Sequence, residues 1–285
     1  NWRIRFRGSA YHNTVTVDGQ NQTLYLPKEV EAGTRHRSGT VRHRVAGPAP
    51  TCRLEGFVVS DGLDMLHGVA RSAQYDAVHE RRILFVFDEY WIVSDFLHAP
   101  TRHRYDHWLH LTEHAHGQVE VDRRRGTLIA CTPGLCVAHE DRDGVAIDVQ
   151  HGYVSYRYGE KHAAPILRLT QEGANARFNV VLYPHRARAP ELAVRELPLR
   201  GSGRDTALGA CALEVKVGGG LDGHTDTLLF GCDPERPVRF ASYTFRGSHL
   251  ALRRNATGDV IALHADRSSR LEEGGQRILA PGLRR

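Results

Sequence analysis

The chain has 285 residues, of which 41% are hydrophobic, and carries a formal net charge of +5. This length suits one large domain or two small ones, and the apolar fraction is enough for a sizeable core. No segment approaches the roughly 18 consecutive apolar residues of a membrane helix, and no signal-peptide pattern opens the sequence. Because the first residue is Asn1 rather than Met, we expect the chain to be a fragment or a processed product.

Arginine supplies 35 of the 38 cationic side chains. A codon bias toward arginine explains this composition, and so does a need for forked recognition of carboxylate or sulfate groups. The two explanations are compatible. The positive balance favours an acidic polymer, either polysaccharide or nucleic acid, as the partner.

The five cysteines are an odd number, which argues against an essential disulfide framework. Cys131 and Cys136 lack the spacing of a zinc knuckle, although a disulfide within a hairpin could join them.

The first predicted strand lies in the segment 7–22, which reads RGSAYHNTVTVDGQNQ. Apolar and polar residues alternate over 14–18, as in a half-buried strand, and Asp18-Gly19 signals a turn. His12 and Asn13 directly precede this strand. An imidazole and an amide are therefore carried on a rigid element, as a binding or catalytic site requires.

Further strands follow one another along the chain. Residues 81–87 and 90–96 flank Asp88-Glu89 and predict a hairpin. Residues 103–111 alternate, with the odd-numbered side chains from Tyr105 onward on one face. Other strands are expected at 118–122, 127–131, 135–139, 146–149, 166–170, 177–183, 212–217, 227–231, 238–245, 249–254 and 260–264. No apolar stripe of helical period lasts more than two turns. The sequence therefore predicts an all-β fold, a large antiparallel β-sandwich with little helix.

The expected organisation is a sandwich core over 1–185, a connection over 186–203, and further strands of the same sandwich over 204–285. The connection is rich in Arg, Pro and Gly and has weak periodicity, as in a linker. We favour an edge connection within one sandwich over a boundary between two domains.

Several segments together resemble the heparinase II/III-like polysaccharide lyases. Residues 7–22 are similar to the family's R-x-T-x-A-H-N-T-V-x-V-D-G-x-x-Q stretch, with Ser9 in place of Thr and Tyr11 in place of Ala. The remaining similar segments are 89–96 (D-x-x-x-V-x-D), 106–111 (W-H-L), and 152–155 with 158–161 (G-W-x-S…Y-G-x-K). The resemblance covers about residues 1–185, and the rest is only generically β.

The resemblance implies a bacterial-type enzyme of two lobes, an N-terminal α/α toroid and a C-terminal β-sandwich, of which this chain matches the second. Such enzymes cleave uronate-containing polysaccharides by β-elimination, and a periplasmic or secreted location is implied. A toroid Tyr and a toroid Asn or His are the usual catalytic groups. The sandwich adds a His from a G-H-x-H-x-D motif that this sequence lacks. The resemblance therefore implies that the main proton-transfer groups lie upstream and that the isolated chain is inactive.

His12 corresponds to a family histidine that binds a structural zinc, so the resemblance makes it a candidate ligand whose partner ligands are expected upstream. Zinc requires three or four ligands, and a lone imidazole would hold it poorly. The alternatives are a histidine hydrogen-bonded to backbone at the start of the strand, or a direct catalytic role.

Five residues are candidates for substrate binding: Arg7, Tyr11, Asn13, Tyr158 and Lys161. Tyr158 is also a weak candidate for proton transfer. Structural readings stand beside these, with Arg7 solvated at a strand end, Asn13 orienting the strand entry, and the tyrosine in ordinary strand alternation. A histidine group invites a metal hypothesis, but its members do not share one strand face, and we favour ordinary surface and core histidines: His103, His107, His110, His114 and His116.

Other classes of function lack their motifs, because the sequence has no G-x-S-x-G elbow, no P-loop and no H-E-x-x-H. Basic residues interleaved with aromatics are too sparse for a nucleic-acid module. Neither nucleic acid nor membrane is therefore an expected partner, whereas an acidic polysaccharide and an upstream toroid are. The alternatives are a non-catalytic carbohydrate- or exopolysaccharide-binding sandwich and a purely structural sandwich.

Overall fold

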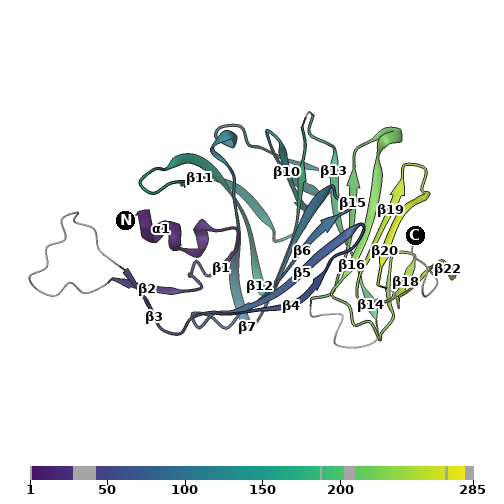
Figure 1. The fold of residues 1–285 in the computed structure, drawn as a ribbon, viewed down its shortest axis with the longest axis horizontal. Coiled ribbons are helices and arrows are strands. Elements are labelled where there is room, and N and C mark those ends of the chain that lie inside the picture. The colour runs from purple at the N-terminus through teal and green to yellow at the C-terminus, as the bar shows by residue number, and fades with distance from the viewer. Residues whose placement is uncertain (1, 28–42, 187, 202–208, 267–268, 280–285) are drawn as a thin grey trace, which may run out of the picture.

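The computed structural model describes residues 2–27, 43–186, 188–201, 209–266 and 269–279. Helix α1 (Trp2–Arg7) and the short 3-10 helix η1 (Ser9–Tyr11) lead into strand β1 (Val15–Val17), after which the regular structure of the described residues is almost entirely β (Figure 1). The described residues include two further 3-10 helices, η2 (Glu113–Ala115) and η4 (Gly220–Asp222). No helix among the described residues is long and apolar enough to cross a membrane.

The largest sheet of the described residues has ten antiparallel strands. Its main path runs β4 (Thr51–Val58), β5 (Leu63–Arg71), β6 (Val78–Val86), β7 (Tyr90–His110), β12 (His162–Pro184), β10 (Leu135–Glu140), β9 (Thr127–Thr132) and β8 (Glu120–Arg124). Strand β1 pairs with β7, and β11 (Ala146–Val154) pairs with β12. The predicted hairpin is confirmed: Val86 pairs with Tyr90, and Phe87 and Asp88 have positive φ as a tight turn requires.

The two central strands are longer than predicted. Predicted strand 90–96 and residues 103–110 of predicted strand 103–111 are parts of the single strand β7, and 166–170 and 177–183 are parts of β12. They stay continuous because β7 and β12 pair with each other along both halves, with a bulge between Gly173 and Asn175. A Cβ on Gly173 would lie 2.7 Å from the Asn175 carbonyl oxygen, so the bulge needs glycine.

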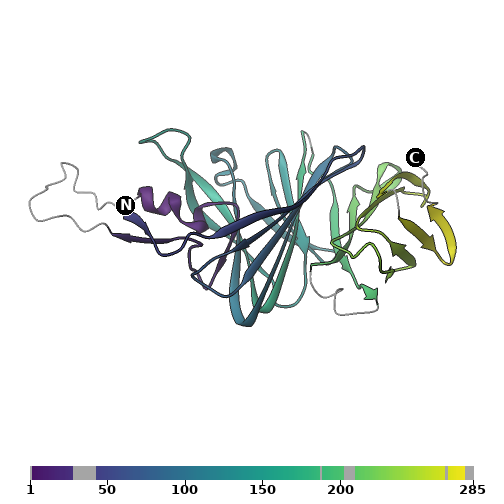
Figure 2. The same ribbon diagram turned by 60° about the horizontal axis from the view of Figure 1, so that its bottom comes forward.

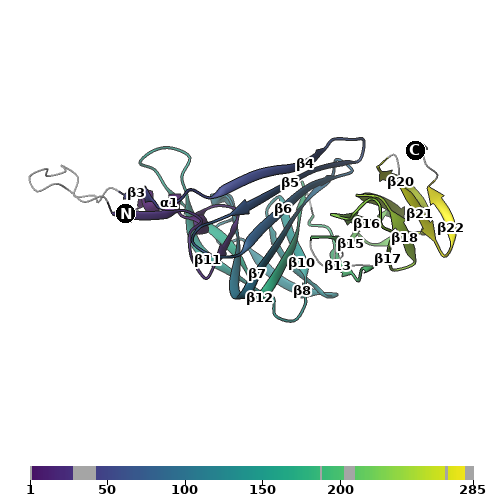
Figure 3. The ribbon, with the colours of Figure 1, turned by 90° about the horizontal axis from the view of Figure 1, so that it is seen from below.

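The C-terminal strands form two further sheets of five strands each. The second sheet runs β13 (Leu192–Leu197), β15 (Cys211–Val217), β16 (His224–Phe230), β19 (Leu250–Asn255) and β20 (Val260–Ala265). The third runs β14 (Arg200–Gly201), β17 (Val238–Phe240), β18 (Tyr243–Arg246), β21 (Arg270–Glu273) and β22 (Gln276–Leu279). A small ribbon pairs β2 (Leu24–Pro27) with β3 (His43–Ala46). Figures 2 and 3 show these C-terminal sheets at the end of the molecule opposite α1.

Strand alternation places the second sheet between the other two. On β15, Leu213 and Val215 enter a core shared with Leu84 and Ile92 of the first sheet, whereas Ala212 enters a core shared with the third sheet. A separate cluster of buried hydrophobic side chains is formed mainly by strands of the first sheet. These layers confirm the predicted all-β antiparallel sandwich. Segment 186–203, expected as a connection, contains β13 at the edge of the second sheet.

A disulfide joins Cys131 to Cys136 across the β9–β10 hairpin, where the two residues pair directly. Cys52, Cys211 and Cys232 are free.

Candidate functional site

The opening motif folds into one compact unit beside β7. The Ser9 amide donates to Asn21 Oδ1 over 2.7 Å, and the Gln22 amide donates to Ser9 Oγ over 2.9 Å. The Gln22 side chain also donates to Thr14 Oγ1 over 3.3 Å. Hydrogen bonds between polar residues therefore connect the two ends of the motif. His12 and Asn13 are exposed in the loop before β1.

Asp18 closes the turn after β1, with positive φ as the Asp-Gly pattern predicts. Its carboxylate accepts the Arg104 amide over 2.9 Å and His103 Nδ1 over 2.6 Å, while His103 Nε2 lies 2.7 Å from Asp76 Oδ1. Because carboxylates only accept, both ring nitrogens of His103 donate, and the hydrogen bond to Asp18 raises the pKa of His103. His103 thus joins the motif turn to the β5–β6 loop.

Asn13 is tied to the sheet through both its backbone and its side chain. Its Oδ1 accepts the His110 amide over 2.8 Å, and its carbonyl accepts Arg81 NH1 over 2.6 Å. His110 Nε2 donates to the Ala10 carbonyl over 2.9 Å, and burial lowers the pKa of His110. Residues distant in sequence therefore meet at the His12–Asn13 corner.

Behind this corner lies Asp95, whose side chain is fully buried. It accepts Arg81 Nε and NH2 over 2.6 and 2.7 Å and lies 2.6 Å from His79 Nε2 and 3.0 Å from His107 Nε2. Burial opposes its ionisation, but the charges of Arg81 and His79 and the hydrogen bonds hold the pKa of Asp95 well below its usual range.

Sequence reasoning missed this group, since neither Arg81 nor His79 belongs to a motif. A signal was available in the predicted hairpin, whose register sets Arg81 opposite Asp95. Opposite charges in a cross-strand pair attract each other.

Aromatic and cationic side chains surround α1. The Lys161 ammonium lies 3.7 Å from the Trp2 ring centroid and 4.0 Å from that of Tyr153, a cation–π arrangement. Tyr11 packs between Phe6, at 5.2 Å, and His110, at 5.4 Å. Figure 1 shows the hairpin of β11 beside α1.

The remaining predicted residues lie at the same end of the molecule. The Arg7 guanidinium lies 4.6 Å from the Tyr25 ring centroid. Tyr158 is 98% exposed in the turn between β11 and β12. The fold thus gathers Arg7, Tyr11, His12, Asn13 and Lys161 around α1, with Tyr158 on the adjoining hairpin. We call this set the motif surface.

The motif surface offers groups suited to an acidic sugar: arginines on α1, an exposed amide and imidazole, and aromatic rings. The described residues contain no group of three His, Cys, Asp or Glu side chains that could hold a metal ion. His12 therefore lacks companion ligands within the described parts of the chain, and these residues alone do not fit a zinc site.

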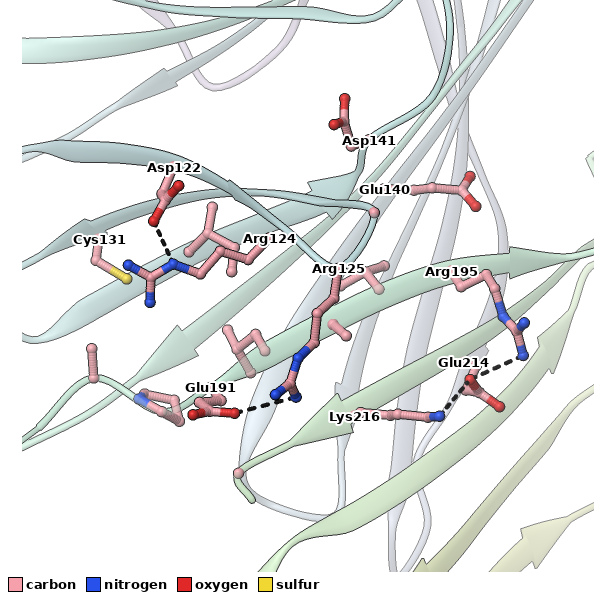
Figure 4. Close-up of a pocket in the computed structure, with 18 of the residues that line it drawn as sticks. Asp122, Arg124, Arg125, Cys131, Glu140, Asp141, Glu191, Arg195, Glu214 and Lys216 are labelled. Atoms are coloured by element: carbon pink, nitrogen blue, oxygen red, sulfur yellow. Dashed lines mark hydrogen bonds and ion pairs between the residues drawn. The ribbon is translucent and has the colours of Figure 1, made fainter. Parts of the chain in front are cut away.

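A groove of about 880 Å³ lies elsewhere, between the β8–β9 hairpin and the strands β13 and β15 (Figure 4). Its charges are largely paired: Arg125 lies 3.3 Å from Glu191, and Arg195 and Lys216 lie 3.1 and 3.4 Å from Glu214. Because carboxylates and cations balance, this groove suits an acidic polymer less well than the motif surface.

These features define an antiparallel β-sandwich domain with a cationic, aromatic surface at one end. Residues 1–193 match the family described as heparinase II/III-like, C-terminal. The match covers more than half of the chain, and the chain belongs to this family. No curated protein matches it.

Solved structures with the same fold include heparan sulfate lyase HepC from Pedobacter heparinus, with a TM-score of 0.56 and 20% identity over 76% of this chain. A heparinase III structure has a TM-score of 0.55 and 15% identity over 79% of this chain. A heparinase III named as the BT4657 gene product has a TM-score of 0.55 and 16% identity over 80%. This chain spans 30 to 31% of the length of those proteins.

Proposed function

We propose that this chain is the β-sandwich domain of a polysaccharide lyase that cleaves acidic, uronate-containing polysaccharide by β-elimination. Membership of the heparinase II/III-like C-terminal family supports this proposal, as does the fold shared with structures named heparan sulfate lyase and heparinase III. The observation that carries it is the motif surface, which collects cations, an amide and an imidazole from distant parts of the sequence.

β-Elimination needs a group that neutralises the sugar carboxylate, a base that removes the C5 proton and an acid that protonates the leaving oxygen. We assign the first task in part to the motif surface, where Arg7 and the Asn13 amide can bind an acidic group. Tyr158 is almost fully exposed, and we assign it no proton-transfer role. The proton-transfer groups are therefore assigned to an upstream α/α toroid, whose position against the motif surface would form the cleft.

Two further parts of the proposal concern the setting of the domain. His12 is kept as a candidate ligand for a structural zinc whose other ligands would lie upstream, and no chemical step is assigned to that ion. A periplasmic or secreted location is supported by the Cys131–Cys136 disulfide, because such bonds persist in oxidising compartments.

A non-catalytic carbohydrate-binding domain is the second candidate. The Lys161 ammonium, which lies against two aromatic rings, supports this candidate because a cation held among aromatic rings is suited to binding. On this view the sandwich binds polysaccharide and performs no chemistry.

The test is a lyase assay that follows the ultraviolet absorbance of the unsaturated product on heparan sulfate and other uronate polysaccharides. We expect no turnover by this chain and turnover by the same chain extended with its upstream lobe. Turnover by this chain alone would contradict the assignment of the proton-transfer groups. Saccharide binding without turnover in either form would favour the binding domain.

A further inference from the structure

The corner formed by His12 and Asn13 is held from inside the sheet by one side chain. Arg81 uses Nε and NH2 on the Asp95 carboxylate, at 2.6 and 2.7 Å, and NH1 on the Asn13 carbonyl, at 2.6 Å. Its guanidinium therefore bridges the buried strand β7 and the exposed motif loop.

The bridge has a fixed geometry because its inner end is fixed. Asp95 is fully buried on β7 and also contacts His79 at 2.6 Å and His107 at 3.0 Å. Two parallel hydrogen bonds to one carboxylate set the plane of a guanidinium. With that plane set, the remaining nitrogen NH1 can only point along one direction, which is toward Asn13.

The outer end of the bridge places polar groups that face solvent. Asn13 Oδ1 is taken by the His110 amide at 2.8 Å. The Nδ2 of Asn13 has no hydrogen-bond partner among the described residues, and Asn13 is exposed. This amide group therefore remains available to a bound saccharide.

We propose that Arg81, fixed by Asp95, is a positioning residue that holds the Asn13 Nδ2 amide in place for the polysaccharide. This inference rests on the proposed function for its purpose, but the positioning itself can be measured without any ligand. It assigns a role to two residues of the β6–β7 hairpin, neither of which touches substrate.

The decisive variant is Arg81→Lys, which keeps a positive charge beside Asp95 but cannot donate to Asp95 and Asn13 in the same forked manner. A matched control is Arg253→Lys, because Arg253 makes the same two-point contact with buried Asp226, at 2.7 and 2.7 Å, far from the motif in the second sheet. Asn13→Ala removes the amide side chain altogether and so gives the largest change expected in each measurement.

The first readout is hydrogen exchange of the His110 amide, whose acceptor is Asn13 Oδ1. We expect exchange about tenfold faster or more in Arg81→Lys and Asn13→Ala, and within about twofold of the parent in Arg253→Lys. Unchanged His110 exchange in Arg81→Lys, or equal acceleration in Arg253→Lys, would overturn the inference.

The second readout is binding of a heparan sulfate oligosaccharide by calorimetry. We expect a Kd about tenfold weaker in Arg81→Lys and unchanged in Arg253→Lys. If the parent chain binds nothing, the proposed function fails, and His110 exchange still decides the positioning role.

If Arg81→Lys does not fold, the parent chain provides the same answer by NMR. A held guanidinium gives separate, slowly exchanging Nη proton signals with contacts to the motif loop. Averaged signals without such contacts would overturn the inference.

Discussion

Replacing Asp226 with alanine is expected to lower the free energy of unfolding by about 3–5 kcal/mol, because it removes one partner of a buried ion pair. Asp226 is fully buried on β16. It accepts two hydrogen bonds from Arg253 of β19, at 2.7 and 2.7 Å, and one from Tyr90 of β7, at 2.7 Å. The substitution would leave Arg253 without its main counter-charge.

The same network crosses from the second sheet to the first. Arg253 NH1 donates to Glu89 at the β6–β7 turn over 2.6 Å, and the Tyr183 hydroxyl of β12 also donates to Glu89. We therefore propose that the strands after residue 203 belong to the same cooperative unit as those before 186. Asp226→Ala should weaken the whole chain rather than the C-terminal sheets alone.

Urea unfolding followed by both circular dichroism and tryptophan fluorescence measures this effect. We expect one transition, shifted equally for both probes. The control Arg195→Ala breaks an exposed pair with Glu214 and should cost less than about 1 kcal/mol. Two separate unfolding transitions in Asp226→Ala would contradict the proposal of a single cooperative unit. So would a loss of unfolding free energy no larger than that of the control.

Acidification is expected to destabilise the chain between pH 6.5 and 4, with His139 making a large contribution. His139 is buried on β10, and its Nδ1 donates to the Glu140 carbonyl over 2.6 Å. Its Nε2 has no hydrogen-bond partner among the described residues. Burial lowers the pKa of His139 to about 4.

The sign follows from proton uptake. The unfolded chain protonates His139 near pH 6.5, whereas the folded chain does so only near pH 4. Stability is therefore lost as the pH falls through this window, by about 3 kcal/mol in full at 1.36 kcal/mol per pKa unit. Burial lowers the pKa of other histidines in the same direction: His67, His107, His110, His224, His249 and His264.

His139→Gln tests this contribution, because glutamine can still donate to the Glu140 carbonyl but does not titrate. Free energies of unfolding at pH 7.5 and pH 4.5 should differ by about 2 kcal/mol less in the variant than in the parent. The hydrogen bond to Asp18 raises the pKa of His103, so this histidine has the opposite effect on stability. It stabilises the fold at low pH, and that stabilisation is lost as the pH rises. An identical pH dependence in His139→Gln and the parent would contradict the assignment.

Local patterns predicted much of the fold. Alternation and turn residues located the β6–β7 hairpin and the Asp18-Gly19 turn, because strand period and positive φ are set by neighbouring residues. They did not predict that β7 and β12 are single long strands, since that depends on their mutual pairing. Helix α1 was also missed, because six residues carry no clear helical period.

The candidate site was predicted only in part. The motif located His12 and Asn13, and the fold placed Arg7, Tyr11 and Lys161 near them. The contacts that fix the corner, from Arg81 to Asn13 and from Lys161 to Trp2, join residues 68 and 159 positions apart. No local pattern encodes such contacts, because they depend on how the sheet brings its strands together.

The most direct test of the central claim is an NMR titration of this chain with a heparan sulfate oligosaccharide. We predict that the resonance shifts will cluster on α1, the His12–Asn13 corner and the β11–β12 hairpin. The resonances of residues such as Arg125 and Arg195, which line the groove between the β8–β9 hairpin and strands β13 and β15, should not shift. Shifts confined to that groove, or no shifts at saturating oligosaccharide, would contradict the assignment of the motif surface as the polysaccharide-binding site.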